Sequence, residues 1–170
     1  MDNKKQRIII ISLSIISMAA IGVTIWALFF RDTKPKVNLD YAPQQIESNA
    51  EKADDDKTKL EQPEGGGAVS LTYSNKVTLS LQSKQANLLF QNPSKSNQNM
   101  MLEIVIDHKT IVKSGRIDPG YKIEKLDGVD MNKLSKGSYE GKFVISYYEA
   151  KSGEKAMINT EIPITITVEE

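Results

Sequence analysis

Composition and charge exclude several classes of function for this chain. It has 170 residues, no cysteine, a single histidine and a formal net charge of zero, with 22 basic and 22 acidic side chains. A balanced charge excludes the basic field that nucleic-acid binding requires. The lack of cysteine excludes disulfides and cysteine-ligated zinc. Partners are therefore to be sought among membranes, proteins or uncharged ligands.

The first predicted element is an apolar run from Ile8 to Phe30, which contains no charged side chain in 23 positions. As a helix it would be about 35 Å long, enough to cross a hydrocarbon core of about 30 Å. We predict an uncleaved transmembrane signal-anchor over 8–30. Cleavage after Ala19 would leave an apolar tail on the mature chain, which argues against a removable signal peptide.

The orientation of this span is less determined than its position. Lysine and arginine are tied at three each beside its two ends, so charge alone does not set the topology. The short N-terminal tail, residues 1–7, favours a cytoplasmic N-terminus. We therefore expect a single-pass cell-membrane protein whose C-terminal domain is extracytoplasmic.

A stripe of small residues, Ser17, Ala20, Thr24 and Ala27, lies at helical spacing within the run. Such stripes let membrane helices approach closely. No GxxxG motif is present, and small residues are common in membrane helices, so the stripe indicates at most weak self-association.

Residues 31–67 have the composition of a linker. They carry nine acidic and six basic residues, few large apolar side chains, and end in three consecutive glycines, 65–67. Such a segment buries too little apolar surface to offset its ordering entropy. We predict a flexible acidic linker, with a short helix over Gln44–Lys59 as the alternative. The run Asp54–Asp56 is interpreted as solvated charge, since no spaced oxygen ligands follow it.

The remaining residues, 68–170, alternate apolar and polar side chains with the period of two that is typical of strands. About 100 residues suffice for one small core. Seven or eight short strands separated by turns predict an all-β sandwich. The expected strands are Val69–Tyr73, Val77–Leu81, Ala86–Phe90, Met100–Ile106, Thr110–Ser114, Tyr121–Leu126, Tyr139–Tyr148 and Ala156–Val168.

One local motif refines this fold class. The sequence from Leu134 to Tyr139, Leu-Ser-Lys-Gly-Ser-Tyr, resembles the L-x-x-G-x-Y tyrosine corner of immunoglobulin-like and fibronectin-III-like domains. The resemblance implies an Ig-like antiparallel β-sandwich of about seven strands. It places Leu134 in the core, Gly137 at the turn and the Tyr139 hydroxyl on upstream backbone. The chain departs from antibody domains in lacking both cysteines and the core tryptophan. Its overall arrangement resembles small single-pass envelope proteins of Gram-positive bacteria.

Residues that could carry chemistry are few. His108 is expected at a hairpin tip, where a general base would lack an oriented partner and a cleft, so we interpret it as a solvated turn residue. Asp127, Asp130 and Asn132 follow one another in a loop and could hold calcium, but their spacing is not that of an EF-hand. A plain turn is the favoured interpretation. We predict a non-enzyme with no catalytic, metal or cofactor site.

An anchor, a stalk and a sandwich without chemistry predict a scaffold or protein-interaction module. We expect it in a bacterial envelope assembly such as a secretion, conjugation or surface-fibre apparatus. An exposed edge strand can pair with a strand of a protein partner. The expected edges are Val69–Tyr73 and Ile162–Val168, the second marked by Pro163, which indicates an edge or a bulge.

The alternative function is a module that binds cell-wall polysaccharide. Such a module needs an exposed aromatic platform, and the domain offers few candidates. Tyr139 and Tyr147 fall on the strand face that is expected to be core. Tyr148 falls on the opposite face and is expected to be exposed, but one exposed ring is ordinary surface.

Overall fold

The computed structural model describes residues 3–29 and 40–170. The chain divides into two compact units, an N-terminal helical unit and a β unit that begins at Leu39. Each unit is considered by itself.

The N-terminal unit is the helix α1, Asn3–Phe29. Isoleucine, leucine, methionine and alanine dominate its sequence, and no proline interrupts it. Its large apolar side chains, such as Ile16, Met18 and Val23, are exposed. No helix within residues 3–29 and 40–170 combines the length and apolarity needed to cross a membrane. The predicted span over 8–30, and the self-association through it, thus lack structural support, and its last residue, Phe30, lies outside the described residues.

The described part of the second unit forms one nine-stranded sheet in the order β1-β7-β4-β3-β9-β8-β5-β6, with β2 paired to β4 off this path. All neighbours are antiparallel except β3 and β9, which run parallel. The strands are β1 Ala50–Lys52, β2 Thr72–Tyr73, β3 Lys76–Ser80, β4 Gln85–Asn92, β5 Gln98–Ile106, β6 Lys109–Lys113, β7 Tyr121–Asp127, β8 Gly137–Glu149 and β9 Lys155–Glu169.

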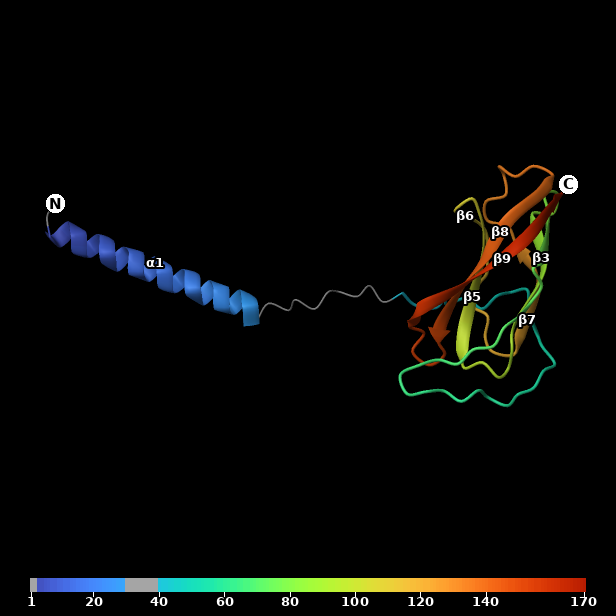
Figure 1. Ribbon diagram of the computed structural model, residues 1–170, viewed down its shortest axis with the longest axis horizontal. Helices are drawn as coiled ribbons and strands as arrows, with labels where there is room; N and C mark the ends of the chain where they lie inside the picture. Colours follow the sequence, from blue (N-terminus) through green and yellow to red (C-terminus); the bar gives the residue numbers. More distant parts are fainter. Residues whose placement is uncertain (1–2, 30–39) are drawn as a thin grey trace. The chain divides into compact units, whose positions relative to one another are not determined.

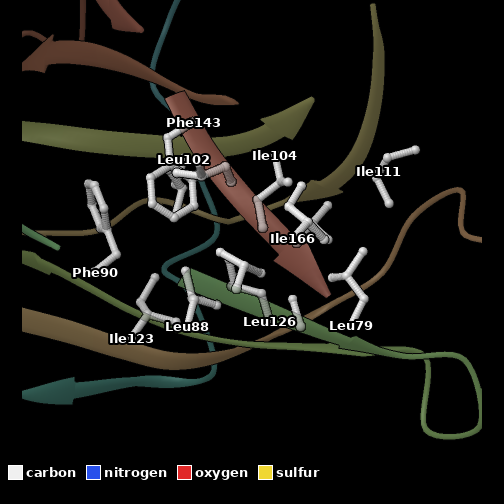
Figure 2. Close-up of a cluster of buried hydrophobic side chains, with 14 of the residues drawn as sticks. Leu79, Leu88, Phe90, Leu102, Ile104, Ile111, Ile123, Leu126, Phe143 and Ile166 are labelled. Carbon is white, nitrogen blue, oxygen red and sulfur yellow. The ribbon is translucent and has the colours of Figure 1, made fainter. Parts of the chain in front are cut away.

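The sheet curls so that its two halves face each other across a single apolar core (Figure 1). Figure 2 shows Phe90, Leu88 and Leu79 on one side and Leu102, Ile104, Phe143 and Ile166 on the other. The rings of Phe90 and Phe143 meet edge to face, with their centroids 6.2 Å apart. Alternation of apolar residues along each strand explains this arrangement, because every second side chain points to the same side.

The predicted all-β class is confirmed, and seven of the eight expected strands lie within a few residues of β3–β9. The expected strand Val69–Tyr73 is reduced to the two residues of β2. The parallel pairing of β3 with β9 also departs from the predicted antiparallel sheet. Two strands so far apart in sequence leave no local pattern from which their relative direction could be deduced.

Residues 40–67 differ from the predicted linker. Ala42 is buried, and β1 pairs with β7 through three residues. The Glu47 carboxylate accepts a hydrogen bond from the Gly115 N–H at 2.7 Å. The segment is held by backbone pairing, by carboxylates and by the small apolar side chains of Ala42 and Ala50, so its composition gives little sign of order. The expected helix over 44–59 is absent from these described residues, and 31–39 lie outside them.

Tyr148 corrects a second expectation. Its side chain is 2% exposed, in a small cluster with Ala42 and Met101. Tyr148 does lie on the face opposite the main core, but residues 40–42 cover that face. Tyr147 is buried and Tyr139 is partly buried, as their strand face predicts.

Candidate functional site: the free edge of β9

The first half of β9 has only one neighbouring strand. β9 pairs with β8 from Asn159, opposite Ser146, to Val168, opposite Gly137, and again at Lys155, opposite Tyr148. A bulge leaves 156–158 without a partner on β8. On its other side β3 covers only Thr165–Glu169. The Lys155 N–H donates to the Asp40 carbonyl at 2.9 Å, so this residue is covered. Among the described residues no strand pairs with this side of Ala156–Ile164. We call this segment the free edge of β9.

The observed free edge overlaps only part of one of the two expected edge strands. Of the expected edge Ile162–Val168, the part from Thr165 onward has a strand on both sides. Only the residues up to Ile164 can accept a partner. Pro163 pairs with Lys142 of β8 and has no partner on its other side, which confirms the edge position that proline predicts.

The direction of the backbone groups follows from one hydrogen bond. The N–H of Thr165 donates to the carbonyl of Asn75 at 2.9 Å, so the polar backbone groups of Thr165 point away from β8. Backbone groups alternate sides along an antiparallel pair. Those of Pro163, Glu161 and Asn159 therefore also point away from β8. Proline has no N–H, which leaves Glu161 and Asn159 as donors and acceptors for an added strand.

Apolar side chains lie beside these backbone groups. Met157 is fully exposed and Ile158 is 72% exposed. Ile158 also lines a groove of about 610 Å³, together with Val69, Tyr147 and Ala156. Exposed apolar residues next to unpaired strand backbone are what a strand-adding partner would cover.

Tyr147 forms part of the floor of this groove. Its hydroxyl donates a hydrogen bond to Thr160 Oγ1 at 2.7 Å, which links β8 to the free edge of β9. Burial raises the pKa of the Tyr147 hydroxyl, so this group stays protonated and remains a donor at neutral pH. The bond fixes the side chain of Thr160 at the groove.

The opposite wall of the groove comes from the segment predicted as linker. Gln62 and the three glycines 65–67 line it, and Val69, from the expected strand Val69–Tyr73, continues it. This segment is held on the loop between β4 and β5: Lys59 Nζ donates to the Ser96 carbonyl at 2.7 Å, and the Ala68 N–H donates to Asn97 Oδ1 at 2.8 Å. The groove thus exists only because residues 59–69 pack on the domain.

Asp55 secures the same loop. Its Oδ2 accepts hydrogen bonds from Gln91 Nε2 at 2.7 Å and from the Ser94 N–H at 2.9 Å. Hydrogen bonding from the Ser94 side chain is the main cause that lowers the pKa of Asp55. The predicted solvated charge run therefore contains an aspartate that contacts the folded domain, and its neighbour Asp56 accepts a local hydrogen bond from the Thr58 N–H at 2.9 Å.

The three residues of the predicted tyrosine corner lie close together in sequence. Leu134 precedes β8, and Gly137 and Tyr139 lie at its start. The Ser135 N–H donates to the Tyr139 hydroxyl at 3.1 Å, and this hydroxyl donates to the Ser135 carbonyl at 2.9 Å. Leu134 is partly buried against the core. Gly137 has a φ of +156°, which L side chains rarely adopt. In a tyrosine corner, hydrogen bonds of this kind fix the preceding loop to the start of the strand.

The residues considered for chemistry are not brought together. His108 and Asp107 occupy the β5–β6 turn with φ of 63° and 47°. Asp127 Oδ1 accepts a hydrogen bond from Gln85 Nε2 at 3.0 Å. Within residues 3–29 and 40–170 no group of three acidic or histidine side chains is placed to hold a metal ion.

Comparison with known proteins gives only distant likenesses. No protein-family model matches the chain, and no curated protein matches it. The solved structures that are similar to it include three chaperones. The E. coli chaperone DraB is 14% identical with a TM-score of 0.39 and 61% of this chain covered. The YadV chaperone is 15% identical with a TM-score of 0.37 and 59% covered. The periplasmic chaperone SfaE is 14% identical with a TM-score of 0.37 and 60% covered.

The chain spans about half the length of these three proteins, 55%, 51% and 56% respectively. Identities and TM-scores this low assign neither a family nor an activity. These likenesses do not support the expected resemblance to Gram-positive envelope proteins. The account of function therefore rests on the sheet and its free edge.

Proposed function

We propose that this protein is a non-enzymatic interaction module of a bacterial envelope assembly, in which the free edge of β9 takes up a strand of a partner protein. The observation that carries the proposal is the pairing pattern of β9: Asn159–Ile164 pair with β8 on one side and with no strand on the other side among the described residues. A partner strand would continue the sheet at this position.

The side chains around the free edge favour a partner with alternating apolar residues. An added strand points every second side chain toward the groove. Val69, Ala156 and Ile158 line that groove, so apolar side chains of the partner would cover them. Pro163 supplies no N–H, so the added strand would pair most strongly with Asn159 and Glu161.

The finer fold assignment is also part of this proposal. We propose an Ig-like domain because the sheet curls around one core and because Tyr139 makes the hydrogen bonds of a tyrosine corner at the start of β8. In such a domain the long strands β8 and β9 form a rigid frame. A rigid free edge loses little conformational entropy when a strand binds to it.

We further propose that the chain is held at the cell membrane with its β unit outside the cytoplasm. This step is carried by the sequence of Ile8–Phe30, which contains no charged residue. The large apolar side chains described for α1, such as Ile16 and Val23, are exposed, and an exposed apolar surface of this kind favours contact with a membrane or a partner. Carbonate extraction of cell membranes tests it: the chain should stay in the pellet, and release into the supernatant would contradict the anchor.

The test of the partner edge uses two matched variants of the tagged full-length chain. Ile158→Lys places a charge at the groove, whereas Val129→Lys places the same charge at an apolar residue of similar exposure, 66%, outside it. Partner proteins recovered from cell envelopes should be lost with Ile158→Lys and kept with Val129→Lys. Equal recovery with both variants would contradict the proposal, provided both fold.

A further inference from the structure

A second cavity, of about 420 Å³, lies where four segments of the β unit meet. These are residues 41–44, the start of β5, the connection 116–119 and the β8–β9 turn 150–153. It shares no lining residue with the groove at the free edge of β9. Its outer wall is formed by residues that were expected to be linker, which is why sequence reasoning did not find it.

Asn99 distinguishes this cavity from ordinary surface. Its side chain is 7% exposed and lines the cavity. Its amide has no hydrogen-bond partner among the described residues, and neither amide atom is one of the fully buried unpartnered atoms. The amide therefore opens onto the cavity, where a polar ligand can reach both its donor and its acceptor.

A planar ion pair lies on the same wall. Arg116 Nε donates to Asp118 Oδ1 at 2.7 Å, and both side chains are about one quarter exposed. Arg116 balances the charge of Asp118 and still has N–H donors to spare. Lys151 adds a second positive charge to the lining. The cavity is therefore unsuited to a metal cation, which Arg116 and Lys151 would repel.

Tyr41 adds an apolar, aromatic face to the cavity. Its ring is 49% exposed and also lines the cavity. One exposed ring alone is ordinary surface. A ring beside an unpaired carboxamide and a guanidinium–carboxylate pair offers both an apolar face and an array of donors and acceptors.

We propose that this cavity binds one sugar residue of a glycan. A sugar hydroxyl both donates and accepts, so vicinal hydroxyls can pair with Asn99 and with the Arg116–Asp118 pair at the same time. The C–H face of a pyranose ring can lie on Tyr41. An apolar ligand would leave Asn99 unpaired, and a simple anion would leave the amide oxygen of Asn99 unpaired. This site gives the module a glycan contact that is independent of the free edge of β9.

The test measures binding of N-acetylglucosamine, galactose and glucuronic acid to the purified full-length chain by saturation-transfer NMR. The detergent must have no sugar headgroup, because such a headgroup would compete. At least one of the three sugars should bind. Asn99→Leu, of nearly the same size, should weaken that binding about tenfold, as expected for one hydrogen bond lost at a buried group.

Two further variants make the result decisive. Asn87→Leu makes the same change at an exposed asparagine of β4 that does not line the cavity, and it should bind like the wild type. Tyr41→Ala should weaken binding even if Asn99→Leu proves unstable, because Tyr41 is half exposed. Absence of binding for all three sugars, or equal binding by Tyr41→Ala and the wild type, would overturn the proposal and leave the free-edge proposal untouched.

Discussion

The packing of residues 40–67 on the β unit makes a prediction about truncation. Two soluble fragments should be compared, 40–170 and 68–170. The shorter one begins where composition alone places the domain boundary. It lacks β1, the cover that Ala42 gives to Tyr148, and the hydrogen bonds that the carboxylates of Glu47 and Asp55 accept.

The size of the effect can be worked from these contacts. Exposing one face of Tyr148 and Met101 loses part of the roughly 1.5–3 kcal/mol that each fully buried large side chain contributes. Each lost hydrogen bond to a carboxylate removes about 1.5–3 kcal/mol. The ordering entropy of the removed segment offsets much of the sum. We expect a net loss of about 2–4 kcal/mol, or roughly 10–25 °C in Tm for a domain of this size.

Urea and thermal unfolding followed by circular dichroism measure this difference directly. Amide spectra of both fragments add a local check, since the signals of β7 and of the loop 93–97 should change most. Equal Tm values and unchanged spectra would refute the packing of residues 40–67 and restore a flexible linker.

Three single substitutions test the frame around the candidate site. Tyr139→Phe removes both hydrogen bonds to Ser135 and should cost about 0.5–1.5 kcal/mol in urea unfolding; no loss would mean that the corner does not stabilise the domain. Gly141→Ala places a Cβ 2.9 Å from a backbone oxygen, and thermal unfolding should show a loss of about 1–3 kcal/mol; an unchanged Tm would contradict this close approach. The lowered pKa of Asp55 stabilises the fold above its ordinary value near 3.9, and this contribution disappears as the pH falls through that range. Asp55→Asn should therefore lower stability at pH 7 and flatten its decline between pH 5 and 3, and an unchanged pH profile would contradict a role for the charge.

Much of the fold could be predicted from the sequence because strands that face a core alternate. The periods of β4, β5 and β9 are clear enough to locate them. The alternation of apolar residues does not determine which strands lie next to each other in the sheet. The parallel pairing of β3 with Thr165–Glu169 divides β9 into a covered half and a free half, and no local pattern marks that division.

The candidate site was predictable only in part, for the same reason. Pro163 does signal an edge, because a proline cannot donate to a second strand. The groove and the second cavity depend on residues 41–69, whose order rests largely on hydrogen bonds and on a few small apolar contacts. The burial of Tyr148 likewise depends on Ala42, more than a hundred residues away in the sequence.

The most direct test of the free edge is a photo-crosslinking scan in intact cells. A photoreactive amino acid would replace Met157 in one full-length variant and Lys125, an exposed residue of β7, in another. The account predicts a discrete protein adduct from position 157 that is lost when Asn159→Pro removes a backbone donor of the free edge, and no such adduct from position 125. An adduct that survives Asn159→Pro, or that forms equally at both positions, would contradict strand addition at β9.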